Sequence, residues 1–244
     1  MTLRFAVVHE AEADFHIATE LADRVLVEAI DWLDEDQLIS TYQWISTTED
    51  GRRLTWTGLA KMAGEMGIEA YGHFDGQPGL PDARAARRAL LVLRTTIPDL
   101  QGVVLIRDQD NQPKRHEGLK QARNVHVGTA TIVIAVAITE RESWVICGFD
   151  PMTAAERARL DVERRLLGFD PRLRSHDLAA CNDDNAVHSP KRVLLMLADG
   201  DWGRQRYCWT GTSLGDLRTR GDRNGLANYL DEIRELLAPL IGTG

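Results

Sequence analysis

The chain has 244 residues, of which 43% are hydrophobic and 27% are charged, and its formal net charge at pH 7 is −8. This length can bury the core of one large domain, or of a domain with a subdomain, without disulfide or metal staples. The acidic balance disfavours tight, unaided binding to DNA, because the molecule repels a nucleic-acid backbone unless its basic residues gather on one face. It does not exclude a nuclease, since a metal site itself requires clustered carboxylates.

Membrane proteins and disulfide-rich secreted proteins are disfavoured by simple sequence features. The longest apolar run, residues 131–138, is far too short to span a bilayer. The N-terminal residues lack the long apolar segment and the small-residue cleavage site of a signal peptide, so a cytoplasmic location is expected. Cys147, Cys181 and Cys208 show no metal-ligand spacing, and their odd number argues against a disulfide scaffold. We expect them to be buried or idle thiols.

The chain opens with a predicted strand and a predicted helix that meet at an acidic residue. Residues 3–8 form a short apolar run that ends at His9 and Glu10. Residues 12–26 then carry apolar side chains at helical spacing, which predicts an amphipathic helix. Glu10 therefore follows a buried strand directly, at the edge of the sheet where α/β proteins build their sites.

The next part of the chain is more varied. It is expected to contain a strand over residues 41–47, a short helix or insertion over residues 56–67, a flexible loop over residues 72–81 and a helix over residues 83–93. Asp82 precedes the last of these and is expected to be its N-cap.

The most informative stretch is residues 102–110, where a continuously apolar run stops at Asp108 and Asp110. Such a run is typical of a strand buried on both faces of a parallel sheet. The two carboxylates can hold a hard divalent cation through oxygen ligands. Taken alone, the motif also fits haloacid-dehalogenase-like phosphatases, sugar-nucleotide transferases and plain surface turns.

A third buried strand also runs into acidic residues. Residues 113–123 predict an exposed helix with Pro113 at its start. Residues 131–138 then form an apolar run that is followed by Glu140 and Glu142. Because strands alternate with helices, the sequence predicts an α/β fold with a mostly parallel sheet flanked by helices, whose acidic strand ends gather on one side.

Beyond residue 150 the pattern is helical. Helices are predicted over residues 153–167, over residues 189–197 with Ser189 as N-cap and Pro190 in the first turn, and over residues 226–241. Residues 200–215 allow no clear assignment. We therefore expect an α/β domain over residues 1–150 and a mainly helical C-terminal subdomain over residues 151–244.

The acidic strand ends carry a resemblance to a known family. Glu10 after the first strand, the pair Asp108 and Asp110 after a later strand, and an acid after the next one together resemble the TOPRIM (topoisomerase–primase) domain. Residues 134–146 are similar to an Ala-Val and Glu-x-Glu-x-Trp segment of a TOPRIM-like bacterial family of unknown function. Residues 189–194 are similar to the start of a later Pro-Lys helix in that family. The resemblance spans most of the chain and implies a TOPRIM-like sheet.

The resemblance implies a site for metal-dependent phosphoryl transfer. Asp108 and Asp110 would ligate Mg²⁺ or Mn²⁺, which neutralises charge on the phosphodiester and lowers the pKa of an attacking water. The other implied roles are general acid or base, or further metal ligand, for Glu10; ligand of a second metal for Glu142 and less so for Glu140; and stabilisation of phosphate charge for Lys191 or Lys114.

Each of these residues also has an ordinary structural interpretation. Glu10 and Glu142 can be solvated acids at helix starts, the aspartate pair can be a polar turn, and Lys191 can be an exposed lysine. His9 at a strand end is expected to be structural, and Trp144 is expected to anchor the core. The arginines of residues 157–174 alternate with acids and are expected to form a solvated helix face.

The leading hypothesis is a Mg²⁺-dependent TOPRIM-like nuclease that cleaves nucleic-acid phosphodiesters, with DNA expected ahead of RNA. Members of the resembled family are encoded beside AAA- or ABC-type ATPases in settings associated with phage defence, so such an ATPase is the expected partner. The alternative is a catalytically silent sensor or regulatory subunit. It is motivated by the acidic net charge and by two glycines of the TOPRIM pattern that are absent, one at Ala11 and one after Asp110.

A dehalogenase-like phosphatase is disfavoured, because its aspartate pair normally lies near the start of the chain and is followed by Thr or Val. No membrane partner is expected, and the oligomeric state is left open, a homo-oligomer included.

Overall fold

The computed structural model describes residues 2–181 and 183–242. The chain forms two compact units, one made of residues 1–107, 112–135 and 231–244 and the other of residues 108–111 and 136–230. Neither unit is continuous in sequence, since the chain passes from one to the other near the ends of two strands. The expected division into domains at residue 150 stays a prediction.

A four-stranded, mostly parallel sheet organises the fold, as the sequence predicts. Its strands lie in the order β2 (Tyr42–Ile45), β1 (Leu3–Val8), β5 (Gly102–Asp108) and β6 (Thr131–Ala137). β1 is parallel to both neighbours, with Leu3 opposite Tyr42 and Val8 opposite Leu105. The apolar runs of β1, β5 and β6 are almost fully buried because helices cover both faces of the sheet.

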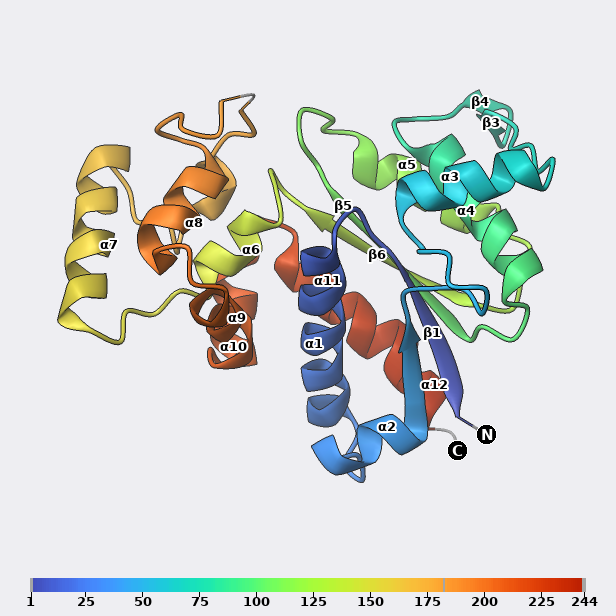
Figure 1. Ribbon diagram of the computed structural model, residues 1–244, viewed down its shortest axis with the longest axis horizontal. Coiled ribbons are helices and arrows are strands. Elements are labelled where there is room, and N and C mark those ends of the chain that lie inside the picture. The colour runs from blue at the N-terminus through green and yellow to red at the C-terminus, as the bar shows by residue number, and fades with distance from the viewer. Residues whose placement is uncertain (1, 182, 243–244) are drawn as a thin grey trace. The chain divides into compact units, whose positions relative to one another are not determined.

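The connections between strands place helices on both faces of the sheet. α1 (Glu12–Ala29) leads from β1 to β2 on one side of β1, while α4 (Ala83–Thr96) leads to β5 on the other side and α5 (Arg115–Asn124) continues to β6. Right-handed crossovers in opposite directions put α1 on one face and α4 and α5 on the other. α3 (Trp56–Glu65) packs against α4, as Figure 1 shows.

The C-terminal helix packs against α1 within the first unit, through its part that follows residue 230. It runs through α11 (Leu226–Glu232), a π-helical segment η3 (Ile233–Leu237) and α12 (Ala238–Gly242), so the predicted helix over residues 226–241 is confirmed. Glu232 accepts hydrogen bonds from Arg123, both at 3.0 Å, and from the backbone N–H of Ile134 at 2.7 Å. One carboxylate thereby satisfies an N–H of β6, which is an edge strand.

Residues 72–81, expected as a flexible loop, contain regular secondary structure. They contain a small antiparallel hairpin of β3 (His73–Phe74) and β4 (Gln77–Pro78). Asp75 and Gly76 in its turn have φ values of 48° and 79°. A two-residue turn of this kind needs both central residues at positive φ, and Asp-Gly supplies them.

The helix expected over residues 113–123 exists but differs from the prediction. It begins at Arg115, two residues after the proline, and it is half buried rather than exposed. A Cβ at Gly118 would lie 1.9 Å from the carbonyl oxygen of Pro81. The absence of a side chain at this position lets α5 pack closely on the segment before α4.

The second unit is built from short helices. They are α6 (Glu142–Cys147), α7 (Ala154–Leu167), α8 (Pro190–Ala198), α9 (Trp202–Thr210), α10 (Leu214–Arg220) and the start of α11. Three short helices complete the described secondary structure of the chain: η1 (Glu35–Gln37), α2 (Leu38–Thr41) and η2 (Ser175–Asp177). The helical C-terminal region and the cap at Ser189 are confirmed, and Asp201 caps α9, the helix within residues 200–215.

Trp144 is the core anchor of this unit, as the sequence predicts. Its side chain is completely buried and stacks on Tyr229 with ring centroids 5.4 Å apart. Its indole Nε1 donates to the carbonyl oxygen of Asn224 at 2.9 Å. The polar atom of the large aromatic ring is therefore satisfied inside the core.

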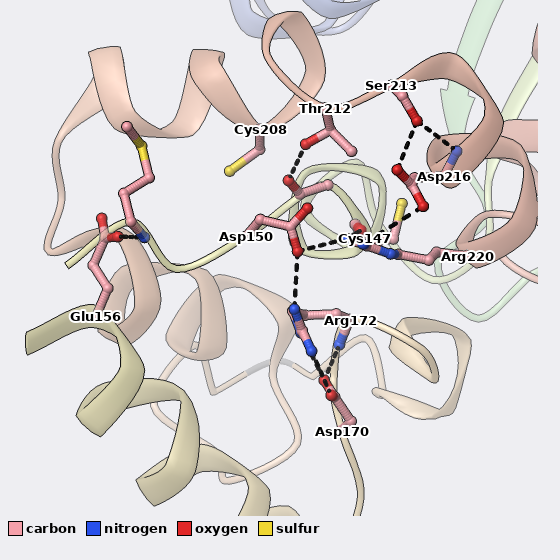
Figure 2. A network of polar contacts seen from close by, with 12 residues as sticks. Cys147, Asp150, Glu156, Asp170, Arg172, Cys208, Thr212, Ser213, Asp216 and Arg220 are labelled. Atoms are coloured by element: carbon pink, nitrogen blue, oxygen red, sulfur yellow. Dashed lines mark hydrogen bonds and ion pairs between the residues drawn. The ribbon is translucent and has the colours of Figure 1, made fainter. Parts of the chain in front are cut away.

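A polar network ties the loops of the second unit together (Figure 2). Oδ1 of Asp150 accepts from Arg172 at 2.9 Å and from Arg220 at 3.0 Å. Arg172 also pairs with Asp170, and Arg164 pairs with the same carboxylate at 2.5 Å. These arginines neutralise acids within the unit.

The three cysteines are free thiols, as expected.

Among residues 2–181 and 183–242, no helix has the length and apolar character needed to cross a membrane.

Candidate functional site

Glu10 lies in the first unit at the carboxyl end of β1. Because Val8 is opposite Leu105, Glu10 comes level with Arg107 near the end of β5, and its carboxylate pairs with that guanidinium at 2.8 Å. The connection between β1 and β2 and the connections to β5 and β6 leave in opposite directions here. Such a reversal in an open α/β sheet is where ligands bind.

The junction between β1 and α1 is held by a carboxylate within the helix. Oδ2 of Asp14 accepts from the backbone N–H of Glu10 at 3.1 Å and of Ala11 at 2.8 Å. Ala11 has φ −128° and ψ 163°, which is ordinary extended backbone. Alanine adopts it without strain, so the missing glycine of the TOPRIM pattern has no backbone cost here.

Arg107 is the centre of an ion-pair network that the sequence did not indicate. Its Nε lies 3.3 Å from Oδ2 of Asp82, and Arg115 reaches the same oxygen at 2.5 Å. The guanidinium of Arg107 also lies over the ring of Trp56, 5.1 Å from its centroid. The indole Nε1 of Trp56 donates to the carbonyl oxygen of Ile106 at 2.9 Å, which fixes the ring against β5.

The predicted capping role of Asp82 is wrong. Asp82 stands at the N-cap position of α4, but its φ is 62° and its side chain makes no capping hydrogen bond. Its carboxylate is instead held by Arg107 and Arg115. Two guanidinium groups attract a carboxylate more strongly than a backbone N–H does, and they come from elements distant in sequence.

His9 precedes Glu10 and is buried, with only 1% of its surface exposed. Its Nδ1 lies 3.0 Å from the carbonyl oxygen of Ala11, so Nδ1 carries the proton in the neutral ring. Its Nε2 has no hydrogen-bond partner among the residues that the structure describes. Burial lowers the pKa of His9, so the neutral form is favoured.

Asp108 and Asp110 lie in the second unit. The backbone N–H of Gln109 donates to Ala137 at 2.8 Å, and that of Asp110 donates to Thr139 at 2.9 Å, so this segment pairs with the end of β6. Oδ1 of Asp108 accepts from the backbone N–H of Arg141 at 2.7 Å, at the start of α6. Asp110 has φ 48°, a conformation that aspartate tolerates. Asp110 thus takes a left-handed turn conformation without a glycine.

Glu140 is a buried carboxylate of the second unit whose two oxygens are unequally satisfied. It is 7% exposed, and its Oε2 has no hydrogen-bond partner in the described part of the chain. Its Oε1 lies 3.8 Å from Nζ of Lys191. Burial raises the pKa of Glu140, Lys191 opposes this, and the negative charges of Glu142 and Asp110 raise it further.

Glu142 and Lys191 have other partners as well. The carboxylate of Glu142 pairs with Arg141 at 2.6 Å. Lys191 lies 3.1 Å from Asp184, and this hydrogen bond raises the pKa of the lysine. Lys114, the alternative lysine of the sequence prediction, belongs to the first unit and precedes α5. The second unit thus brings Asp110, Glu140, Glu142 and Lys191 within electrostatic range of one another.

The donor chemistry of this group fits a hard divalent cation. Its acidic members offer oxygen ligands, and Oε2 of Glu140 is a buried carboxylate oxygen without a donor in the described chain. In their present positions, no three His, Cys, Asp or Glu side chains among the described residues form a group that could hold a metal ion. A cation here would draw the carboxylates together, and Glu142 would have to exchange Arg141 for it.

Comparison with known proteins leaves the family open: no family model matches the chain, and no match was found among curated proteins or solved structures. The resemblance to TOPRIM domains therefore stays a prediction from the sequence.

Proposed function

We propose that this protein is a Mg²⁺-dependent, TOPRIM-like phosphodiester hydrolase that cleaves nucleic acid. The observation that supports it most is Glu140, which is 7% exposed and has an oxygen without a hydrogen-bond donor among the described residues. A buried carboxylate is costly unless a positive charge or a donor satisfies it. Lys191 at 3.8 Å meets only the other oxygen. Glu142 and Asp110 add negative charge near Glu140, as their effect on its pKa shows, so a cation would stabilise all three carboxylates.

Within this proposal the residues have distinct roles. Asp108, Asp110 and Glu140 hold the cation, with Glu142 as a further ligand once it leaves Arg141. A bound Mg²⁺ neutralises phosphate charge and lowers the pKa of an attacking water. Lys191 stabilises the additional negative charge that develops on the phosphate. The role of Glu10 as general acid or base stays a prediction from the sequence.

Nuclease and calorimetric assays test the proposal. The purified protein, alone and with the product of its neighbouring gene, is incubated with DNA and with RNA in Mg²⁺, in Mn²⁺ or in EDTA. Metal-dependent cleavage, lost in Glu140→Gln and Asp110→Asn, is expected. Asp161→Asn is the matched control, because this exposed aspartate lies on α7 and pairs with Arg164. If no sample cleaves and calorimetry detects no metal binding, the proposal is wrong.

A second candidate is a catalytically silent sensor or regulatory subunit of an ATPase. It is favoured by a specific observation, since Glu10 and Glu142 are each held by an arginine, at 2.8 and 2.6 Å, rather than left for a metal. The variant Asp108→Ala/Asp110→Ala separates the candidates. A silent subunit keeps its biological activity, such as protection against phage together with the ATPase, whereas a nuclease loses it.

The anti-phage setting and the AAA- or ABC-type ATPase partner rest on the sequence resemblance alone. Co-purification of the protein with the product of an adjacent ATPase gene tests this part of the proposal. The absence of such a gene beside this one would contradict the partner without affecting the chemistry proposed for the acids.

A further inference from the structure

Helix α4 of the first unit carries positive charge without acids. Its sequence between Ala83 and Thr96 contains Arg84, Arg87, Arg88 and Arg94 and no Asp or Glu. The chain as a whole has a net charge of −8. Four arginines on one helix are therefore a local reversal of the charge of the molecule.

These arginines differ from most others because they form no ion pairs within the described chain. Arg84 donates to the carbonyl oxygen of Ala70 at 3.0 Å, and Arg94 donates to that of Val127 at 2.7 Å. The side chain of Arg88 has no hydrogen bond or ion pair with any residue in the described ranges. In the same unit, Arg4 pairs with Asp99 at 2.6 Å and Arg123 with Glu232 at 3.0 Å. The charge on α4 is thus left available to an external anion.

An aromatic surface adjoins the arginines. Arg87 donates to the carbonyl oxygen of His73 at 3.2 Å, and its guanidinium lies 5.9 Å from the ring centroid of Tyr71 and 5.5 Å from that of Phe74. Tyr71 is 74% exposed, while Phe74 is buried beneath the hairpin. An exposed ring that is braced by an arginine offers a face on which a nucleobase can stack.

The arginine surface also continues towards the sheet. Leu80, Asp82, Arg84, Ala85 and Arg88 line an open hollow at the start of α4. The carboxylate of Asp82 in this hollow is already held by the two arginines of the network at the end of β5. The hollow therefore keeps an excess of positive charge, and this network reaches Glu10 at the end of β1.

Two acids lie near this surface and do not neutralise it. Glu69 precedes the residue whose carbonyl oxygen binds Arg84, and Asp75 lies in the turn of the hairpin. Both side chains are exposed, and neither is ion-paired in the described part of the chain. Exposed acids are screened by solvent and salt, so they weaken the positive field without cancelling it.

We infer that α4 and the β3–β4 hairpin form a binding surface for single-stranded nucleic acid. Arg84, Arg87 and Arg88 contact successive phosphates, and an unpaired base stacks on Tyr71. This combination of arginines with an exposed aromatic ring favours a single strand, because a duplex keeps its base faces stacked inside. The inference deepens the proposed function by naming the surface that holds the substrate, but it concerns binding alone and can be tested without cleavage.

Fluorescence anisotropy with a labelled 20-nucleotide oligo-dT in EDTA at 50 mM salt tests the inference. Arg84→Gln/Arg87→Gln/Arg88→Gln is expected to weaken binding at least tenfold, and to lower the slope of log K against log salt by about 2, since each phosphate contact contributes about 0.7. Tyr71→Ala is expected to lose roughly fivefold or more. Arg88→Glu serves as the variant that keeps every described contact, and it is expected to weaken binding as well.

A matched control removes the same charge elsewhere. Arg157→Gln/Arg159→Gln/Arg165→Gln on α7 of the second unit is expected to change the affinity less than twofold, and thermal unfolding of every variant confirms its fold. The inference is wrong if the α4 variant binds like this control, if Tyr71→Ala has no effect, or if anionic phospholipid vesicles bind to the surface and oligo-dT does not. Binding that survives in a protein without nuclease activity supports this surface and counts against the proposed function.

Discussion

The ion pair between Glu163 on α7 and Arg192 on α8 is expected to be the strongest single electrostatic contribution to the second unit. The guanidinium meets both carboxylate oxygens, at 3.0 and 2.6 Å, and Glu163 is 1% exposed. Arg192→Ala leaves that buried carboxylate without its partner, which costs about 3–5 kcal/mol. Since each kcal/mol lowers the Tm of a chain of this size by about 2–4 °C, the expected fall is roughly 6–20 °C.

Thermal and urea unfolding followed by circular dichroism measure this loss. Glu163→Leu is expected to cost less than Arg192→Ala, because Arg192 still donates to the carbonyl oxygen of Val187 at 3.1 and 2.7 Å. The control is Arg159→Ala. Arg159 lies 3.5 Å from Asp199, whose side chain is 81% exposed, so the loss of this ion pair is expected to cost less than about 1 kcal/mol. If Arg192→Ala costs no more than this control, the reasoning is refuted.

Three further predictions concern the core, the thiols and the response to pH. Trp144→Ala removes a completely buried indole and is expected to cost about 3–5 kcal/mol in urea unfolding, whereas Trp202→Ala, at 43% exposure, is expected to cost far less. Maleimide is expected to label Cys181 alone in the native protein, because burial raises the pKa of the other two thiols to about 12, and mass spectrometry of Cys181→Ser checks this. Burial lowers the pKa of His9, so its neutral form contributes stability that is complete above the unfolded value of about 6.5 and is lost as the pH falls through the folded value. His9→Asn is expected to flatten the decline of Tm between pH 6.5 and 5, and an unchanged slope would contradict this.

The sheet could be predicted because its signal is local. Residues 103–106 and 132–137 are unbroken apolar runs, which are typical of strands that are covered on both faces. The start of α8 could also be predicted, since Ser189 and Pro190 together are typical of a helix N-terminus. Elements without apolar periodicity could not be predicted. α9 begins after an N-cap at Asp201, but its glycine, arginines and tyrosine interrupt the helical spacing of apolar residues, so its sequence does not show an amphipathic pattern.

The hairpin over residues 73–78 shows the same limit from the other side. Its strands have two residues each, too few for any alternation to be visible. The Asp75-Gly76 turn was the only available signal, and such turns also occur in loops. Likewise, the π-helical segment η3 cannot be distinguished by sequence from the α-helical turns around it.

The position of the acids was predictable and their partners were not. That Glu10 and Asp108 lie at the ends of buried strands can be read from the apolar runs before them. That Arg107 holds Glu10 depends on how β1 and β5 pair, which no single segment encodes. Glu140 and Glu142 are two residues apart and look equivalent in sequence. The fold buries the first and pairs the second with Arg141, a difference that depends on tertiary contacts and not on the local sequence.

Charge pairing finally connects the two proposals. In the described chain most arginines meet a carboxylate, so internal pairing accounts for their charge without any ligand. Among the exceptions are two of opposite sign: the arginines of α4, which contact carbonyl oxygens and aromatic rings but no carboxylate, and Glu140, whose Oε2 lacks a donor within residues 2–181 and 183–242. These groups lack a full counter-charge within the described chain, so the arginine surface favours a polyanion and the buried carboxylate favours a cation. A nucleic acid and a divalent metal ion satisfy both demands, which is why the binding assay in EDTA and the metal-dependent assay must be run on the same set of variants.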